Sequence, residues 1–221
     1  MNKVYPEFSV LISVYAKENP VWLKQAIESV LANSILPKQI VIVKDGKLTN
    51  ELDSVLDYYS NIPIFQIVGY EVNKGLGFAL NYGLEYCSCD YVARMDSDDV
   101  CANNRFEKQL DLFLEKNELA LIGSNIYEFV GDPSNVQSIR VAPCSHSDII
   151  KFSKKRNPFN HPSVMFLKKA IIDSGGYIDM FRCEDYYLWY RVLKKNYQTE
   201  NIQDCLVYMR ISDDFLREEA E

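Results

Sequence analysis

The stretch Tyr91-Val92-Ala93-Arg94-Met95-Asp96-Ser97-Asp98-Asp99 joins a short apolar run to a cluster of three acids. Residues 91–95 are apolar apart from Arg94, which predicts a buried strand. Asp96 and Asp98 follow two residues apart, so in extended backbone their carboxylates project to the same side. Adjacent carboxylates repel each other unless a cation lies between them, and oxygen ligands of this kind suit Mg²⁺ or Mn²⁺. Because ligands of open α/β sheets gather beyond the carboxyl ends of the strands, we predict a site for a metal ion and a diphosphate here.

The acids also admit simpler interpretations. Acidic residues after a strand often form a solvated turn, and Asp98 or Asp99 would suit the N-cap of a helix expected near 103–115. An Asp-x-Asp pair alone does not separate these possibilities from a metal site. An EF-hand loop is a poor fit, because that pattern needs an oxygen ligand and then a glycine where this chain has Val100 and Cys101.

Composition narrows the class of protein. The 221 residues are enough for one large domain, and their hydrophobic (48%) and charged (25%) shares are those of an ordinary globular protein. A net charge of −7 argues against nucleic-acid binding. No apolar run approaches the ~20 residues of a membrane span. The six cysteines have no zinc-like spacing with the two histidines, His146 and His161, so we expect reduced thiols in a cytosolic protein.

Apolar patterning predicts alternating strands and helices along the first part of the chain. Strands are expected at 8–15, 39–43, 64–68, 91–95 and 119–124, and helices at about 20–33 and 52–59, from the glycine-rich stretch 73–83 to about 87, and at 103–115. Four strand–helix repeats call for parallel strands with right-handed crossovers, which is a doubly wound α/β domain. After residue 131 the pattern loosens. Strands are expected there at 138–141, 164–167 and 202–209, with one helix from Ser145 to about Lys155 and another after Cys183.

A set of motifs occurs in a characteristic order. They are Ser13-Val14-Tyr15 with Glu18, Glu28-Ser29-Val30-Leu31, Asp45-Gly46, Asn73-x-Gly75 with Asn81-x-Gly83, Arg94-Met95-Asp96-Ser97-Asp98-Asp99, Arg105-Phe106, Gly123-Ser124, Asn160-His161-Pro162-Ser163 and Glu184-Asp185-Tyr186-x-Leu188-Trp189. Together they resemble the inverting family 2 glycosyltransferases of the GT-A fold, above all bacterial enzymes that build surface polysaccharide such as O-antigen or capsule. The resemblance covers about 8–210. It implies a single GT-A domain over 1–221 with a Rossmann-like, mostly parallel sheet, in which about 1–130 binds the nucleotide sugar and about 131–221 the acceptor.

The resemblance assigns the nucleotide sugar to residues of the first half. They are Val14, Tyr15, Glu18, Asp45, Asn73, Gly75, Arg94, Asp96 and Ser97. Residues 14–18 would hold the base and ribose, with Tyr15 offering a flat face for stacking unless it simply packs. Asp45 would accept a hydrogen bond from the uracil edge. Asn73 and Gly75 would lie against the sugar, where a missing Cβ permits close contact.

The same resemblance gives the metal ion its ligands. Asp98 would be the main ligand of Mn²⁺ or Mg²⁺, and Asp96 would share the ion or contact the ribose. The ion would neutralise charge on the departing UDP. Arg94 would pair with carboxylates of the site, or else extend from the sheet edge to solvent. Two departures from the family are Lys44, where an acid is usual, and the lack of any histidine after His161, where some relatives place a metal ligand.

Inversion by direct displacement needs a base on the face opposite the leaving group. The resemblance gives this role to Asp185, with Glu184 positioning the acceptor or the base, and the start of a helix would keep Asp185 ionised. Without the upstream motifs both acids would be interpreted as capping residues of a first turn. His161 would meet the acceptor or the sugar, unless its ring is satisfied by backbone.

The expected activity is metal-dependent transfer of a hexose or N-acetylhexosamine from a UDP-sugar to a saccharide linked to polyprenyl diphosphate. The expected location is cytoplasmic, with peripheral association at the inner face of the plasma membrane left open. Two other functions stay open as well. Asp96-x-Asp98-x-Val100 also resembles the nucleophile loop of haloacid-dehalogenase-type (HAD-like) phosphohydrolases, although that loop normally follows the first strand. A non-catalytic module that binds nucleotide sugars would need the same cleft without the base.

Overall fold

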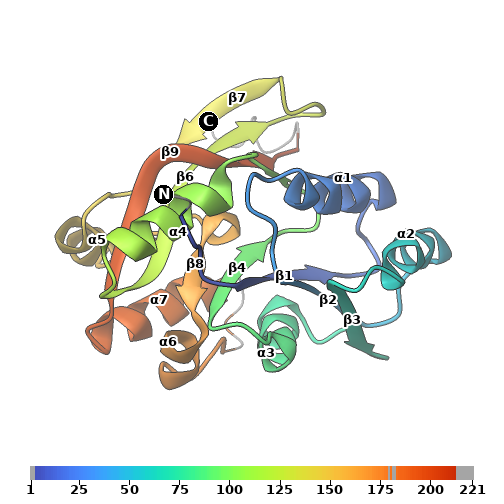
Figure 1. Cartoon of the computed structure of the whole chain (residues 1–221), viewed down its shortest axis with the longest axis horizontal. Helices are drawn as coiled ribbons and strands as arrows, with labels where there is room; N and C mark the ends of the chain where they lie inside the picture. Colours follow the sequence, from blue (N-terminus) through green and yellow to red (C-terminus); the bar gives the residue numbers. More distant parts are fainter. Residues whose placement is uncertain (1–2, 179, 181–182, 213–221) are drawn as a thin grey trace.

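This computed structural model describes residues 3–178, 180 and 183–212. Their strands form a single sheet, on which the helices pack (Figure 1). Its strands are β1 (Phe8–Val14), β2 (Gln39–Asp45), β3 (Phe65–Tyr70), β4 (Tyr91–Met95), β5 (Val100–Cys101), β6 (Leu119–Phe129), β7 (Val136–Arg140), β8 (Met165–Leu167) and β9 (Gln198–Arg210). They lie in the order β3-β2-β1-β4-β8-β6-β9-β5, and β7 pairs with β6 outside this path.

Most of these strands run in one direction. β3, β2, β1 and β4 are parallel neighbours. β8 is antiparallel to both β4 and β6, so β6 runs the same way as β4, and β9 is parallel to β6. Among the described strands, β5, β7 and β8 run the other way. The predicted mostly parallel α/β sheet is confirmed, and the antiparallel β8 joins its two halves.

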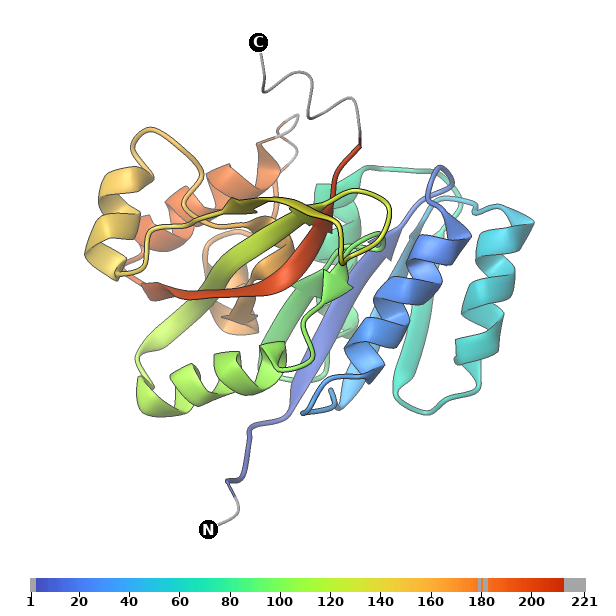
Figure 2. The same ribbon diagram turned by 90° about the horizontal axis from the view of Figure 1, so that it is seen from above.

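Helices cover both faces of the sheet (Figure 2). They are α1 (Pro20–Leu31), α2 (Asn50–Ser60), α3 (Leu76–Tyr86), α4 (Arg105–Glu115), α5 (His146–Phe152), α6 (Lys168–Asp173) and α7 (Glu184–Lys194), with a 3₁₀ turn η1 (His161–Ser163). Alternate residues of a strand point to opposite faces, so Val10 and Ile12 of β1 share a core with α1, α2 and α4. Leu11 faces the core shared with α3, α5, α6 and α7. None of these helices has the length and apolar content to cross a bilayer.

Local sequence explains where several helices begin. The Asn19 side chain accepts a hydrogen bond from the Val21 N–H at 2.8 Å and caps α1, and Pro20 occupies the first helical position. The N-cap of α4 is Asn104, so the interpretation of Asp98 or Asp99 as its cap is wrong. The helix after Ser145 ends at Phe152 and not near Lys155, because the backbone turns at 153–155.

The strand register decides where a ligand can bind. Val14 of β1 lies beside Lys44 of β2, and Ile12 lies beside Met95 of β4. The carboxyl ends of three neighbouring strands therefore open at one edge of the sheet. Because β8 runs antiparallel to β4, the η1 turn that precedes it reaches the same edge.

Candidate active site

A cleft of about 570 Å³ lies at this edge of the sheet. Its walls are Ser13, Val14, Tyr15, Lys17, Glu18, Trp22, Asp45, Asn73, Gly75, Leu76, Asp96, Ser97 and Asp98. This volume is typical of sites that enclose a small molecule. The cleft brings together every residue predicted to bind nucleotide sugar or metal apart from Arg94, which lies buried beneath it.

Asp45 fixes the loop that forms one wall of the cleft. Its Oδ1 accepts hydrogen bonds from the Tyr70 hydroxyl (2.9 Å) and the Lys74 N–H (2.7 Å). Its Oδ2 accepts from Asn73 Nδ2 (2.9 Å) and the Gly75 N–H (3.1 Å). A carboxylate has about four lone-pair directions, so all of them are used within the protein. The predicted uracil contact of Asp45 stays a prediction and requires one of these donors to give way.

Tyr70 is a site residue that the sequence analysis missed. Burial, and then its hydrogen bond to Asp45, raise the pKa of this hydroxyl, which therefore stays a donor. Its role depends on a pairing between β2 and β3 that places Tyr70 beside Asp45. Nothing in the local pattern of β3 marks this tyrosine.

Glu18 and Ser97 connect two other walls of the cleft. The buried Ser97 hydroxyl donates to Glu18 Oε2 at 2.7 Å, and the Asn19 N–H donates to Oε1 at 3.2 Å. Tyr15 is 43% exposed, so its ring is available for stacking. Partial burial and the nearby carboxylates of Glu18 and Asp98 raise the pKa of Tyr15.

Three carboxylates form a cluster at the cleft, of which Asp96 and Asp98 line it and Asp99 is buried. Asp96, Asp98 and Asp99 each offer an oxygen, and these oxygens lie within 4.8 Å of one another. Burial, and then the charges of Asp96 and Glu18, raise the pKa of Asp98 to about 7. Burial together with Asp96 and Asp98 raises the pKa of Asp99 well above its ordinary value. These shifts have the sign expected of carboxylates packed together without a counter-ion.

The donor set of this cluster fits a hard divalent cation. Asp99 Oδ1 accepts the Arg210 N–H at 2.8 Å, while its buried Oδ2 has no hydrogen-bond partner among the described residues. An unsatisfied buried oxygen beside two further carboxylates is a suitable ligand set for Mg²⁺ or Mn²⁺. Asp99, predicted to cap a helix, instead belongs to this cluster.

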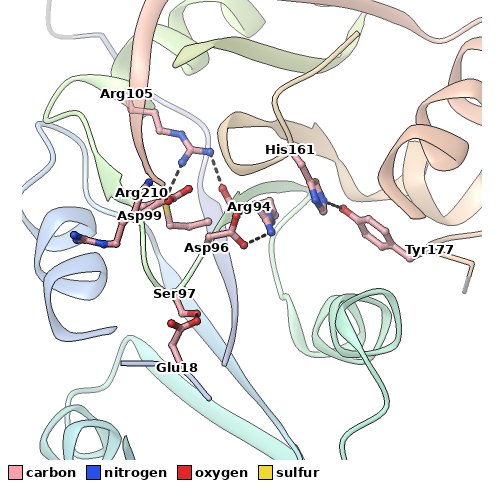
Figure 3. Close-up of polar contacts among 10 residues, drawn as sticks. Glu18, Arg94, Asp96, Ser97, Asp99, Arg105, His161, Tyr177 and Arg210 are labelled. Carbon is pink, nitrogen blue, oxygen red and sulfur yellow. Dashed lines mark hydrogen bonds and ion pairs between the residues drawn. The ribbon is translucent and has the colours of Figure 1, made fainter. Parts of the chain in front are cut away.

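Arg94 pairs with Asp96 in a two-pronged arrangement (Figure 3). Its side chain is 2% exposed, so the alternative in which it extends to solvent is wrong. Arg105, also fully buried, donates to the Arg94 carbonyl at 2.7 Å and to the Val164 carbonyl at 3.2 Å. Arg105 thus connects the end of β4 to the segment that leads into β8.

Arg210, at the end of β9, holds the acidic loop from the other side. Its Nε donates to the Asp98 carbonyl at 2.9 Å, and its Nη2 donates to Gln25 Oε1 at 2.6 Å. The guanidinium lies 4.6 Å from the ring centre of Trp22 and 4.5 Å from that of Phe129. No local pattern predicts this contact, because Arg210 is 112 residues from Asp98.

Asp185 lies in the first turn of α7, as predicted. Its Oδ2 accepts from Asn157 Nδ2 at 2.6 Å, and its Oδ1 accepts from the Tyr186 N–H at 2.7 Å. Burial raises the pKa of Asp185, and these hydrogen bonds oppose the shift only in part. The expectation that the start of α7 keeps Asp185 ionised stays a prediction. Burial sets the direction of the shift.

Glu184 lies beside the start of α3. A Cβ built on Gly77 would meet the Glu184 Cβ at 3.7 Å. Gly75 and Leu76, just before, line the cleft. The helix that carries the predicted base therefore begins next to the wall that carries the predicted sugar site.

His161 points toward Tyr177 (Figure 3). Its Nε2 lies 3.0 Å from the Tyr177 hydroxyl, so the ring is satisfied by a side chain and not by backbone. Its ring centre lies 5.8 Å from that of Trp189. Burial and the charge of Arg94 hold the pKa of His161 well below its usual range, which keeps the ring neutral. Its contact with an acceptor stays a prediction.

Comparison with known proteins agrees with this site. Residues 9–176 match the family model described as glycosyl transferase family 2. The chain belongs to glycosyl transferase family 2. This assignment confirms the resemblance and removes the basis for a phosphohydrolase.

Individual members of the family are also similar to this chain. An Escherichia coli UDP-Gal:alpha-D-GlcNAc-diphosphoundecaprenol beta-1,3-galactosyltransferase is 42% identical, over 94% of this chain and 75% of its own length. The amylovoran biosynthesis glycosyltransferase AmsE of Erwinia amylovora is 39% identical, over 95% and 78%. A crystal structure of S. aureus TarS in complex with UDP-GlcNAc superposes with a TM-score of 0.71 at 17% identity, covering 94% of this chain and 59% of that one. The GT-A fold is thereby confirmed.

Proposed function

We propose that this family 2 glycosyltransferase transfers a hexose or N-acetylhexosamine from a UDP-sugar to a saccharide linked to polyprenyl diphosphate, with inversion at the anomeric carbon. The observation that carries the proposal is that two carboxylate sites, the acidic cluster and Asp185, lie on either side of the cleft wall near the start of α3. Asp96 and Asp98 of the acidic cluster line a nucleotide-sized cleft. Asp185 stands at the start of α7, which contacts Gly77, next to the cleft wall at Gly75 and Leu76. The names of the E. coli and Erwinia relatives support a role in surface polysaccharide.

The donor would lie along the cleft from Tyr15 to the acidic cluster. The exposed ring of Tyr15 would stack on the base, and the loop held by Asp45 would approach the sugar. Gly75 has a φ of +87°, and a Cβ there would meet no protein atom within 4 Å. The positive φ therefore requires glycine at this position, and the absence of a side chain leaves open space on the cleft side.

Asp98 and Asp96 would hold Mn²⁺ or Mg²⁺, with Asp99 adding a third carboxylate to the same cluster. Such an ion stabilises the negative charge of a diphosphate leaving group. Arg94 fixes Asp96, and Arg210 fixes the backbone of Asp98, so both predicted ligands are positioned by buried or stacked guanidinium groups.

Asp185 would act as the general base. The acceptor hydroxyl oxygen forms a bond to the anomeric carbon while the bond from that carbon to the UDP oxygen breaks, and the hydroxyl proton passes to Asp185. A pKa raised by burial strengthens a carboxylate as a proton acceptor. Asn157 orients the carboxylate, and Glu184 would position the acceptor from the adjoining residue.

A lipid-linked acceptor would bring the protein to the inner face of the plasma membrane as a peripheral protein in the cytoplasm. In this proposal residues up to about 130 bind the donor, and the residues after it bind the acceptor. Residues 213–221 of that second part lie outside the described residues.

The test is a screen for UDP release across common UDP-sugars, with a diphosphate-linked N-acetylhexosamine as acceptor, with and without Mn²⁺. We expect release with one donor, only when acceptor and metal are both present. Calorimetry then compares Mn²⁺-dependent UDP binding by the wild type and by Asp98→Ala, with the exposed Asp57→Ala as control. Equal affinities in wild type and Asp98→Ala would contradict the metal assignment. UDP binding without turnover for every donor would favour the non-catalytic module.

A further inference from the structure

A second groove lies beside the first turn of α7, outside the donor cleft. It has a volume of about 300 Å³ and is lined by Ser153, Met180, Cys183, Tyr186, Tyr187 and Tyr190. Tyr187 and Tyr190 are 38% and 45% exposed, so their rings form an open aromatic wall. The Tyr186 hydroxyl donates to the Ser153 carbonyl at 2.6 Å and fixes the groove between α7 and the end of α5. We call this feature the tyrosine groove.

The tyrosine groove adjoins the predicted base. Asp185 immediately precedes Tyr186 in α7, and Asp185 is held by Asn157. Ser153 and Asn157 are only four residues apart, and four extended residues span at most about 14 Å. One short segment of chain therefore contacts both sites, because Ser153 accepts a hydrogen bond from Tyr186 of the groove and Asn157 donates one to Asp185.

Three basic residues directly follow Ser153 of this groove in an otherwise acidic protein. Lys154, Lys155 and Arg156 are exposed, and none of them forms an ion pair with any residue that the structure describes. The Lys194 ammonium lies 5.5 Å from the ring centre of Tyr190. With a net charge of −7 for the chain, this concentration of cations beside an apolar groove marks a surface for an anion with an apolar tail.

We propose that the tyrosine groove and the basic residues 154–156 bind the isoprenoid diphosphate of the acceptor. The cations hold the diphosphate, the tyrosines hold the first isoprene units, and the saccharide is thereby placed at Asp185. Charge complementarity and continuity with the base carry this assignment, which rests on the proposed function. A diphosphate needs several cationic donors, and an isoprene chain needs an apolar wall. The tyrosine groove supplies the apolar wall, and residues 154–156, which directly follow Ser153 of the groove, supply the cations.

Two acceptors with the same sugar diphosphate test the proposal, one carrying a farnesyl group and the other a methyl group. We expect the wild type to prefer the farnesyl compound by about tenfold or more in KM, because isoprene units are buried. The double variant Tyr187→Ala/Tyr190→Ala should lose most of this preference. The variant Tyr58→Ala, which changes a tyrosine 74% exposed on α2, should retain it.

The basic residues are tested by charge removal. The triple variant Lys154→Ser/Lys155→Ser/Arg156→Ser should raise the KM of both acceptors and weaken binding of farnesyl diphosphate, measured by calorimetry, by about tenfold or more. The matched control is Lys3→Ser/Lys38→Ser/Lys108→Ser. It removes the same charge from exposed lysines whose partners are Asp111, Glu7 and Asp204.

The outcomes separate this inference from the function on which it rests. Equal KM values for both acceptors in an active wild type, or an unchanged preference in the tyrosine double variant, would overturn the inference alone. The same holds if the variants lose only binding to vesicles containing phosphatidylglycerol, because the surface would then meet the bilayer and not the acceptor. Absence of transfer from every donor would overturn the proposed function, whereas farnesyl diphosphate binding that depends on the tyrosines and cations would still support the groove.

Discussion

The donor cleft and the acceptor side of this protein use polar groups in opposite ways. In the cleft, Asp45 accepts four hydrogen bonds from Tyr70 and residues 73–75, and Ser97 is bonded to Glu18. Beside α7, by contrast, three cations are free of ion pairs with described residues and two tyrosine rings stand exposed. A preorganised cleft suits a ligand of constant structure such as a nucleotide. An adaptable surface suits acceptors that differ in sugar and chain.

Among the variants that separate the donor cleft from the acceptor side, we expect the largest effect from replacing the predicted base, Asp185. Asp185→Asn keeps an oxygen to accept from Asn157 or the Tyr186 N–H, so the fold should persist. We expect kcat to fall about 10³-fold, because general-base catalysis is lost. UDP affinity in Mn²⁺, measured by calorimetry, should stay within twofold. The exposed Asp173→Asn on α6 serves as control, and a parallel loss of UDP binding in Asp185→Asn would place this residue on the donor side.

Arg210 supports the donor side from the far end of the chain. Arg210→Met removes the bond to the Asp98 carbonyl and to Gln25 and the charged stack on Trp22, but keeps the backbone bond to Asp99. We expect Mn²⁺-dependent UDP affinity to fall about tenfold, with a loss of about 1–3 kcal/mol in unfolding free energy. Arg210→Lys should restore stability more than affinity, because an ammonium cannot reproduce the planar fork. Equal recovery of both would reduce Arg210 to a structural role.

The acidic cluster should destabilise the metal-free protein. The pKa of Asp98 is raised to about 7, so the native state binds this proton more tightly than the unfolded chain does. The ionised carboxylate therefore costs stability above pH 7, and this cost fades as the pH falls through 7. Asp98→Asn should gain roughly 1–2 kcal/mol at pH 8 in EDTA, and less at pH 5.5, by urea unfolding. Asp57→Asn, which is exposed on α2, should show no such pH dependence.

The smallest effect is expected where the cleft has redundant bonds. Tyr70→Phe removes one of the four donors to Asp45 and leaves the other three. We expect a loss of about 1 kcal/mol in unfolding free energy. UDP affinity should stay equal or rise, because a freed lone pair can accept from uracil. Tyr58→Phe is the control, and a large fall in UDP affinity in Tyr70→Phe would mean that the loop depends on this single bond.

The sequence predicted features that depend on local pattern. Strand β4 begins and ends where the apolar run predicted, and α1 begins at Pro20, where the helix at about 20–33 was expected. Features that depend on tertiary contact were missed. The two-residue β5 is too short for any period, and Arg210 reaches Asp98 across 112 residues of chain. The raised pKa of Asp185 likewise follows from burial of its carboxylate in the folded chain, which a rule about the first turn of a helix does not include.

Strand β8 limits how hybrid enzymes can be made from this family. It comes from the second half of the chain but forms the neighbour of β4, and Arg105 of the first half donates to the Val164 carbonyl just before it. A hybrid of two relatives joined at residue 130 would pair β4 of one relative with β8 of the other. It would also set the buried Arg105 of one against the residue-164 carbonyl of the other. Exchanging only α7 and the segment between α5 and η1 would leave that seam intact while carrying the base and the tyrosine groove together.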